Sequence, residues 1–137
     1  MLLGELITVA AYKLNIKIVV IKNNTLGQIK WEQMVFLGNP EFACDLYPAD
    51  FAAIARGAGI HAIQIEDPAT CGQQLESVVN LLEPVLIETV VDQFTPPMPA
   101  KVKASQALKL AEALLRGEPN RMEIAVTNAH DKVRELV

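Results

Sequence analysis

The chain has 137 residues, of which 51% are apolar and 5% aromatic, and its formal net charge is −4. The length predicts one domain, and the aliphatic composition is typical of α/β folds whose sheet is covered on both faces. The acidic charge and the absence of a basic run argue against nucleic-acid binding. Cys44 and Cys71 lack metal-ligand spacing, so we expect a reducing, cytoplasmic location.

The first predicted element is an amphipathic helix within residues 1–14. Its apolar residues recur at helical spacing, and they are Leu3, Leu6, Ile7, Ala10 and Leu14. No capping side chain precedes this helix, so we expect the chain to begin in the middle of a fold. Residues 16–21, IKIVVI, are typical of a parallel strand that is apolar on both faces. This pattern predicts that a neighbouring strand upstream is missing.

Helices and strands alternate along the rest of the chain. The expected order is helix 26–36, loop 36–48, helix 48–59 with Asp50 in its first turn, strand 60–65, helix 67–82 with Asp67 as N-cap, and strand 84–91. A proline-rich connector and two further helices, over 105–117 and from about 119, complete the chain. The alternation predicts an α/β fold with a truncated, doubly wound parallel sheet that lacks its first strands. We expect residues 1–92 to form the C-terminal part of a larger domain. Residues 93–137 should form a proline-rich connector and a C-terminal helical tail.

Residues 1–33, MLLGELITVAAYKLNIKIVVIKNNTLGQIKWEQ, resemble the thiamine diphosphate-binding domain of the pyruvate oxidase and acetolactate synthase superfamily. In that family a Gly-Asp-Gly triplet ends one strand, a helix follows, and the next strand ends in an asparagine. The aspartate, the asparagine and a backbone carbonyl hold Mg²⁺, which in turn holds the diphosphate of the cofactor. The resemblance implies a three-layer fold of which this chain carries the part that follows the triplet.

The resemblance also assigns metal ligands. In the family the ligand asparagine stands four residues before a glycine, and Gly27 places that role on Asn23. Thr25 is then the backbone-carbonyl ligand, and Asn24 is expected to face the turn. The alternative interpretation is that NNTLG is an ordinary turn built from residues that tolerate a left-handed backbone.

Further residues of this segment are expected to contact thiamine diphosphate, namely Leu26, Gly27 and Ile29. By the same resemblance Glu32 faces the reacting end of the cofactor, where a carboxylate carries protons. The alternative for Glu32, and equally for Lys30, is a solvated position on the helix surface. Trp31 is interpreted as a packing anchor.

The rest of the chain resembles the same family, and residues 96–120 resemble the tail of bacterial pyruvate dehydrogenases that use quinone. The resemblance implies a parent enzyme that decarboxylates a 2-oxo acid, foremost pyruvate, and passes electrons to FAD, which is bound by a domain outside this chain. The alternatives are an acetolactate synthase-type carboligase and a non-catalytic association module. We expect the chain alone to be inactive, with the upstream domains as its partners.

Two expectations concern surfaces. The missing strand should leave an unpaired strand edge beside an apolar patch, which predicts a homo-oligomer through the first helix and residues 16–21. The helix over 105–117 is amphipathic with a polar face of mixed sign, so we expect it to dock within the chain rather than on a membrane.

Overall fold

The computed structural model describes residues 3–95 and 103–134. They divide into two compact units, each described here by itself. The first unit holds the residues up to Asn23 and residues 48–91, and the second holds residues 24–47 and those from Asp92 onward. The expected division between residues 1–92 and 93–137 concerns the domains of a larger protein and stays a prediction.

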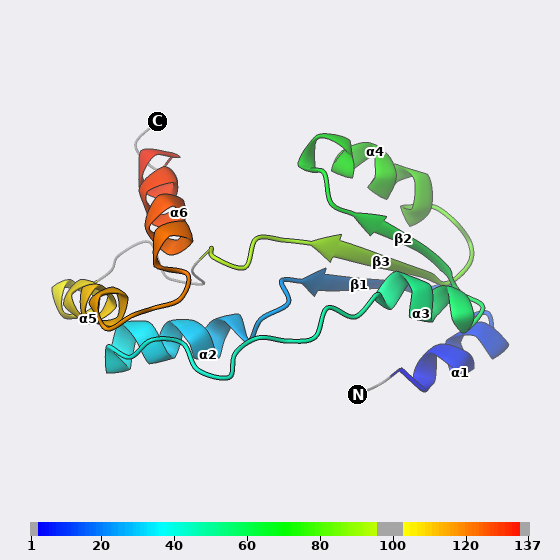
Figure 1. Cartoon of the computed structure of the whole chain (residues 1–137). Coiled ribbons are helices and arrows are strands. Elements are labelled where there is room, and N and C mark those ends of the chain that lie inside the picture. The colour runs from blue at the N-terminus through cyan, green and yellow to red at the C-terminus, as the bar shows by residue number, and fades with distance from the viewer. Residues whose placement is uncertain (1–2, 96–102, 135–137) are drawn as a thin grey trace. The chain divides into compact units, whose positions relative to one another are not determined.

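The first unit is built on a three-stranded parallel sheet (Figure 1). Its strands are β1 (Lys17–Lys22), β2 (His61–Ile65) and β3 (Val85–Val90). The spatial order is β1-β3-β2, so the last strand in sequence lies in the centre, with Lys17 and His61 both in register with Val85. Helical crossovers connect the strands, which confirms the α/β class and the parallel sheet expected from the sequence.

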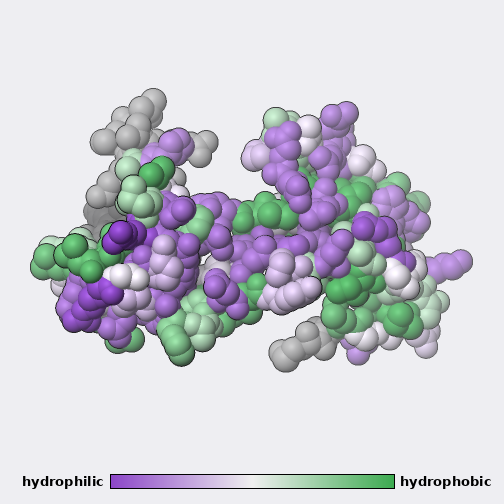
Figure 2. Space-filling view, viewed as in Figure 1, coloured by the Kyte–Doolittle hydropathy of each residue, from purple (hydrophilic) through white to green (hydrophobic). Residues whose placement is uncertain are grey.

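Helices cover both faces of this sheet. On one face, α1 (Glu5–Ala11) and α3 (Phe51–Gly57) pack on β1 and β3 through a core that contains Leu6, Val9, Ala55, Ile60 and Leu86. On the other face, α4 (Pro68–Val79) packs on β2 and β3 through Val78, Ile65, Val85 and Ile87. Figure 2 shows apolar residues reaching the surface around α1.

The predicted face of the first helix is partly wrong. Leu6 and Val9 are buried, whereas Ile7 and Leu14 of the predicted stripe are exposed. The physical reason is length: α1 has seven residues, and such a short helix buries one side of two turns rather than a long stripe.

Two aspartates cap the helices of this unit. The Asp67 side chain accepts a hydrogen bond from the Ala69 N–H, which confirms it as the N-cap of α4. Asp50 is the N-cap of α3, where its side chain accepts from the Ala53 N–H at 2.7 Å, rather than a first-turn residue as expected.

Strand β1 lies at the edge of the described sheet. Val19 and Ile21 are 57% and 72% exposed in the described structure.

The second unit is helical. It contains α2 (Gly27–Glu32), the π-helical segment η1 (Gln33–Leu37), α5 (Ala104–Leu115) and α6 (Arg121–Arg134). Its core joins these elements and consists of Trp31, Met34, Val35, Ala113 and Ile124. Burial of Trp31 and docking of α5 against α2 and η1 confirm both sequence expectations. No helix in the described part of the chain is long and apolar enough to cross a membrane.

Candidate functional site

The carboxyl end of β1 carries the first predicted ligand, Asn23. In open parallel sheets, ligands bind at this edge, outside the carboxyl ends of the strands. The preceding residue, Lys22, is fixed through its carbonyl, which accepts a hydrogen bond from the Val91 N–H at 2.9 Å. Its Nζ also lies 2.7 Å from the Oε1 atom of Glu88. Lys22, which precedes Asn23, is therefore held at two points, by Glu88 of β3 and by Val91 directly after that strand.

Glu88 is fully buried in the central strand. Its second oxygen, Oε2, accepts a hydrogen bond from the Ala52 N–H in the first turn of α3 at 2.8 Å. One carboxylate thus joins β1, β3 and α3, and its charge is compensated by the Lys22 ammonium and by one backbone N–H. The sequence interpretation missed this group, although a single glutamate inside the apolar strand VLIETV was a visible signal.

The second unit begins at Asn24, and hydrogen bonds to residues 44–46 hold the backbone of Asn24 and Thr25. Asn24 has φ of 55°, a left-handed conformation that asparagine tolerates, as expected for a residue that faces the turn. Its carbonyl accepts from the Leu46 N–H at 2.9 Å, and Thr25 forms an antiparallel bridge with Asp45. The Thr25 hydroxyl donates to the Cys44 carbonyl at 3.2 Å, and Thr25 is buried.

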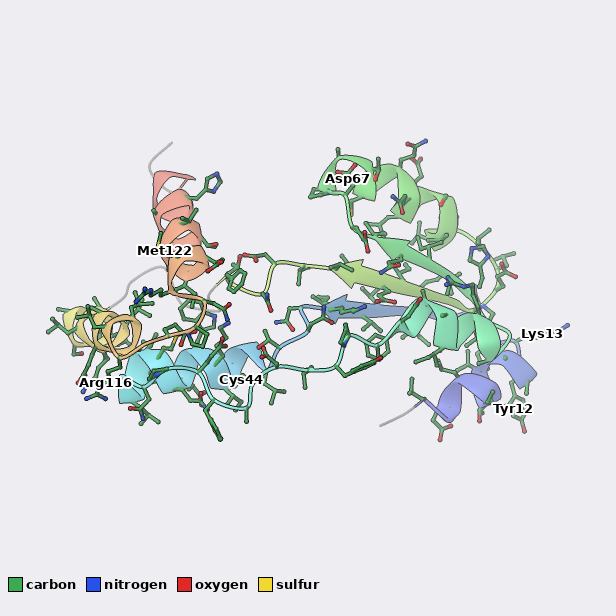
Figure 3. The ribbon with its side chains drawn as sticks, viewed as in Figure 1. Tyr12, Lys13, Cys44, Asp67, Arg116 and Met122 are labelled. Atoms are coloured by element: carbon green, nitrogen blue, oxygen red, sulfur yellow. The ribbon has the colours of Figure 1, made fainter. Side chains whose placement is uncertain are left out.

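The segment around Cys44 therefore holds the backbone of residues 24–26 in place. The Leu26 N–H donates to the Cys44 carbonyl at 2.8 Å, and the same segment lies beside α2 in Figure 3. Burial raises the pKa of the Cys44 thiol, which disfavours the reactive thiolate form. Gln33 fixes the neighbouring Phe42, because its amide accepts from the Phe42 N–H at 2.7 Å.

Helix α2 has one buried and one open side. Trp31 and Lys30 are 3% and 1% exposed, so the surface alternative is wrong for Lys30. Leu26, Ile29 and Glu32 follow one another at three-residue spacing and are exposed. Two of the predicted cofactor contacts, Leu26 and Ile29, thus share the open side of the helix with the predicted catalytic carboxylate, whereas Gly27 is half-buried.

Glu32 is accessible and locally tethered. Its Oε1 atom accepts a hydrogen bond from Gln28 Nε2 at 2.9 Å, one turn earlier on the same helix. This arrangement is compatible with a carboxylate that faces a cofactor and with a surface glutamate, so the catalytic role stays a prediction.

The oxygen donors fit a hard cation only in part. An asparagine amide oxygen and a backbone carbonyl are ligands that Mg²⁺ accepts. Within residues 3–95 and 103–134, however, no group of three or more His, Cys, Asp or Glu side chains is placed to hold a metal. Asn23 belongs to the first unit and residues 25–32 to the second. The assignment of Asn23 and Thr25 as Mg²⁺ ligands therefore stays a prediction.

A pocket of about 300 Å³ opens at the carboxyl ends of β2 and β3, beside the start of α4. Its walls are mainly apolar and include Ile65, Asp67, Cys71, Thr89 and Val91. The Asp67 carboxylate is engaged as the cap of α4, so the pocket presents few polar groups to a ligand. Figure 3 shows Asp67 at this end of α4.

Residues 1–89 match the family described as "Thiamine pyrophosphate enzyme, C-terminal TPP binding domain". The match covers more than half of the chain and includes α2, every predicted site residue and all of the sheet except Val90. The chain belongs to this family of thiamine diphosphate enzymes.

Individual relatives agree with the family assignment. The chain is 28% identical over 116 residues, or 85% of its length, to "Putative thiamine pyrophosphate-containing protein YdaP" of Bacillus subtilis. It is 33% identical over 89 residues (64% of this chain) to "Probable acetolactate synthase large subunit" of Methanococcus aeolicus, and 30% over 117 residues (82%) to "Acetolactate synthase large subunit" of Cyanidium caldarium. The chain spans 20%, 15% and 20% of these relatives, respectively.

Proposed function

We propose that this chain supplies the diphosphate side of a thiamine diphosphate site in an enzyme that decarboxylates a 2-oxo acid. The observation that carries the proposal is the family match across residues 1–89, which spans Asn23 and the open side of α2. When bound, thiamine diphosphate serves as the electron sink for cleavage of the bond that releases carbon dioxide. The residues of this chain bind and orient the cofactor rather than supply that chemistry.

In this proposal each residue has a distinct task. The Asn23 amide oxygen and the Thr25 carbonyl hold Mg²⁺, which neutralises the diphosphate. Leu26 and Ile29 provide an apolar contact for the cofactor from the open side of α2. Glu32 holds and moves a proton next to the reacting carbon, which raises the rate without contributing to cofactor affinity.

The relatives favour a carboligase over an oxidase. Most of the similar proteins carry the name acetolactate synthase, and none of the names given above describes a pyruvate oxidase. We therefore place the condensation of two 2-oxo acids, with pyruvate as the first, ahead of electron transfer to FAD and quinone. The FAD dependence, the quinone acceptor and the upstream partner domains stay predictions.

The test uses the protein that contains this chain, purified with thiamine diphosphate and Mg²⁺ and supplied with pyruvate. Release of carbon dioxide together with an acetolactate-type product is the expected result. Reduction of a quinone-like dye without that product would contradict the carboligase and restore the oxidase. No release of carbon dioxide from any of a panel of 2-oxo acids would contradict the decarboxylase altogether and favour the association module. The isolated 137-residue chain serves as the inactive control.

A further inference from the structure

The carboxyl end of β1 is anchored through both the backbone and the side chain of its last residue, Lys22. The Lys22 carbonyl accepts a hydrogen bond from the Val91 N–H at 2.9 Å, and its ammonium nitrogen lies 2.7 Å from Oε1 of Glu88. The Lys22 side chain is 11% exposed, and that of Glu88 is fully buried. Because the ends of secondary-structure elements open most easily, two anchors on the final residue restrict the path of the chain beyond it.

The Glu88 carboxylate is itself held by a helix. Its second oxygen, Oε2, accepts a hydrogen bond at 2.8 Å from the N–H of Ala52, a buried residue in the first turn of α3. In the sheet, Glu88 is in register with Val20 on one side and with Gln64 on the other. Both carboxylate oxygens are therefore engaged, one by α3 and one by Lys22, and the side chain is fixed in one orientation.

These contacts form a continuous path to the predicted metal ligand. Asn23 follows Lys22 directly, and Ala52, Glu88, Lys22 and Asn23 all belong to the first unit. A ligand has to stay within about 0.5 Å of its productive position, and the residues around it provide that restraint. The fixed backbone of Lys22 sets the point from which the Asn23 side chain starts.

Lys22 has a second conceivable role, because a lysine at this place could bind the diphosphate itself as a point charge. In this structure its ammonium group is engaged by Glu88. If the lysine turned away, the Glu88 carboxylate would stay buried without its cation, which is strongly unfavourable. The geometry therefore favours an indirect role for Lys22 over a direct contact with phosphate.

We propose that Glu88 is a positioning residue of the cofactor site, which acts through Lys22 to fix the place of Asn23 at the carboxyl end of β1. The inference rests on the proposed function, in which Asn23 holds Mg²⁺, and it deepens that function by naming what orients the ligand. Neither Glu88 nor Lys22 touches the cofactor, and both act on the residue that does.

The first test measures the affinity for thiamine diphosphate with Mg²⁺ by calorimetry, in the protein that contains this chain. Lys22→Met and Glu88→Gln should each raise the dissociation constant at least about tenfold, a typical effect of losing a residue that orients a metal ligand. Glu88→Gln keeps the size of the side chain and an acceptor for the Ala52 N–H, so it removes mainly the ion pair. Lys22→Arg retains the cation and should restore most of the affinity.

Lys17→Met is the matched control, since it is the same substitution at the opposite end of the same strand. Lys17 Nζ donates to the Leu81 and Glu83 carbonyls at 2.8 Å each, so its loss should destabilise the unit and leave the dissociation constant unchanged. The double variant Lys22→Met/Glu88→Gln should bind no more weakly than the weaker single variant, because the two residues act as one pair. It leaves no unpaired buried charge, and it therefore replaces a single variant that does not fold.

The second test measures hydrogen exchange of single backbone amides in the protein without cofactor. Lys22→Met should accelerate exchange of the Val91 N–H, because exchange reports local opening of the bond to the Lys22 carbonyl. Lys17→Met should instead accelerate exchange of the Val85 N–H, which donates to the Ile16 carbonyl at 3.0 Å. Equal exchange of the Val91 amide in the wild type and in Lys22→Met would overturn the anchoring of this strand end.

The outcomes separate this inference from the proposed function. A wild-type protein that does not bind thiamine diphosphate contradicts the proposed function itself. If the wild type binds and both Lys22→Met and Glu88→Gln bind equally well, the positioning role is overturned and the proposed function stands. If Lys22→Met binds weakly while Glu88→Gln binds as tightly as the wild type or more tightly, Lys22 contacts the diphosphate directly, which also overturns the role of Glu88.

Discussion

Lys30 and Glu41 form an ion pair inside the second unit, with 2.8 Å between Nζ and Oε2 and side-chain exposures of 1% and 8%. The ammonium group also lies 4.9 Å from the centre of the Phe94 ring, a cation–π distance. The other Glu41 oxygen accepts from the Asn120 side chain, and the Glu41 N–H donates to Glu118 at 2.8 Å. One buried network therefore joins α2, the loop after η1 and the turn between α5 and α6.

The first prediction follows from breaking this pair. Lys30→Met leaves the Glu41 carboxylate buried without its cation, which should lower the free energy of unfolding by about 3–5 kcal/mol. The double variant Lys30→Met/Glu41→Met should recover part of that loss, because no charge then remains buried. Urea unfolding measures both. Lys109→Met is the control: its pair with Glu112 is exposed, and its loss should cost less than about 1 kcal/mol.

The second prediction concerns pH. Burial, together with the neighbouring Glu41 carboxylate, raises the pKa of Glu118 above its ordinary value. The folded state then binds this proton more tightly than the unfolded state, whose glutamate pKa is about 4.3. The contribution of Glu118 to stability is therefore most favourable below that pH and declines as the pH rises through the folded pKa.

The test compares the wild-type chain with Glu118→Gln, in which the charge is absent at every pH. The stability of the variant relative to wild type should increase between about pH 4 and pH 7. The backbone N–H groups of Glu41 and Asn120 contact residue 118 in the wild type, and the rest of the surroundings is the same in both proteins, so the difference reports on the Glu118 carboxyl group. A difference in urea midpoints that stays constant with pH would contradict a raised pKa.

Local signals in the sequence predicted most elements of the fold. Residues 16–21, 60–65 and 84–91 form strands within one residue of the expected bounds, because β-branched runs flanked by polar turns encode strands locally. Asp67 followed by Pro68 predicted the start of α4, because an N-cap residue and a proline at the first helical position stabilise only the first turn of the helix. Strand order was not predictable, because pairing of β1 with β3 joins residues 68 positions apart, as Lys17 and Val85 show.

The site was predicted less completely than the fold. Asn24 carries the turn, as the family spacing implied, but the Lys22–Glu88 pair and burial of Lys30 were not foreseen. A charged residue in a sequence is expected at the surface unless a partner is known, and each partner here comes from a distant segment. The spacing of apolar residues indicates which side of a helix or strand is buried, but it does not predict pairs between residues of different elements.

The third prediction separates the two asparagines in the protein that contains this chain. Asn23→Ala removes a metal ligand and should weaken binding of thiamine diphosphate with Mg²⁺ at least about tenfold, as measured by calorimetry. Asn24→Gly keeps the left-handed backbone at φ 55°, because glycine adopts it without strain, and should leave the affinity unchanged. The reverse result would show that the ligand assignment is shifted by one residue.

The last prediction tests Glu32 in the same protein. Glu32→Gln keeps the shape of the side chain and its contact with Gln28 but removes the ionisable carboxyl group, so turnover should fall by about 10²–10⁴-fold. The affinity for thiamine diphosphate should change little, because the carboxylate acts on the reacting carbon and not on the diphosphate. Glu76→Gln, at an exposed position on α4, is the matched control and should keep full turnover. If Glu32→Gln also kept its turnover within about twofold, the residue would be a surface glutamate, and proton transfer would belong to another segment of the enzyme.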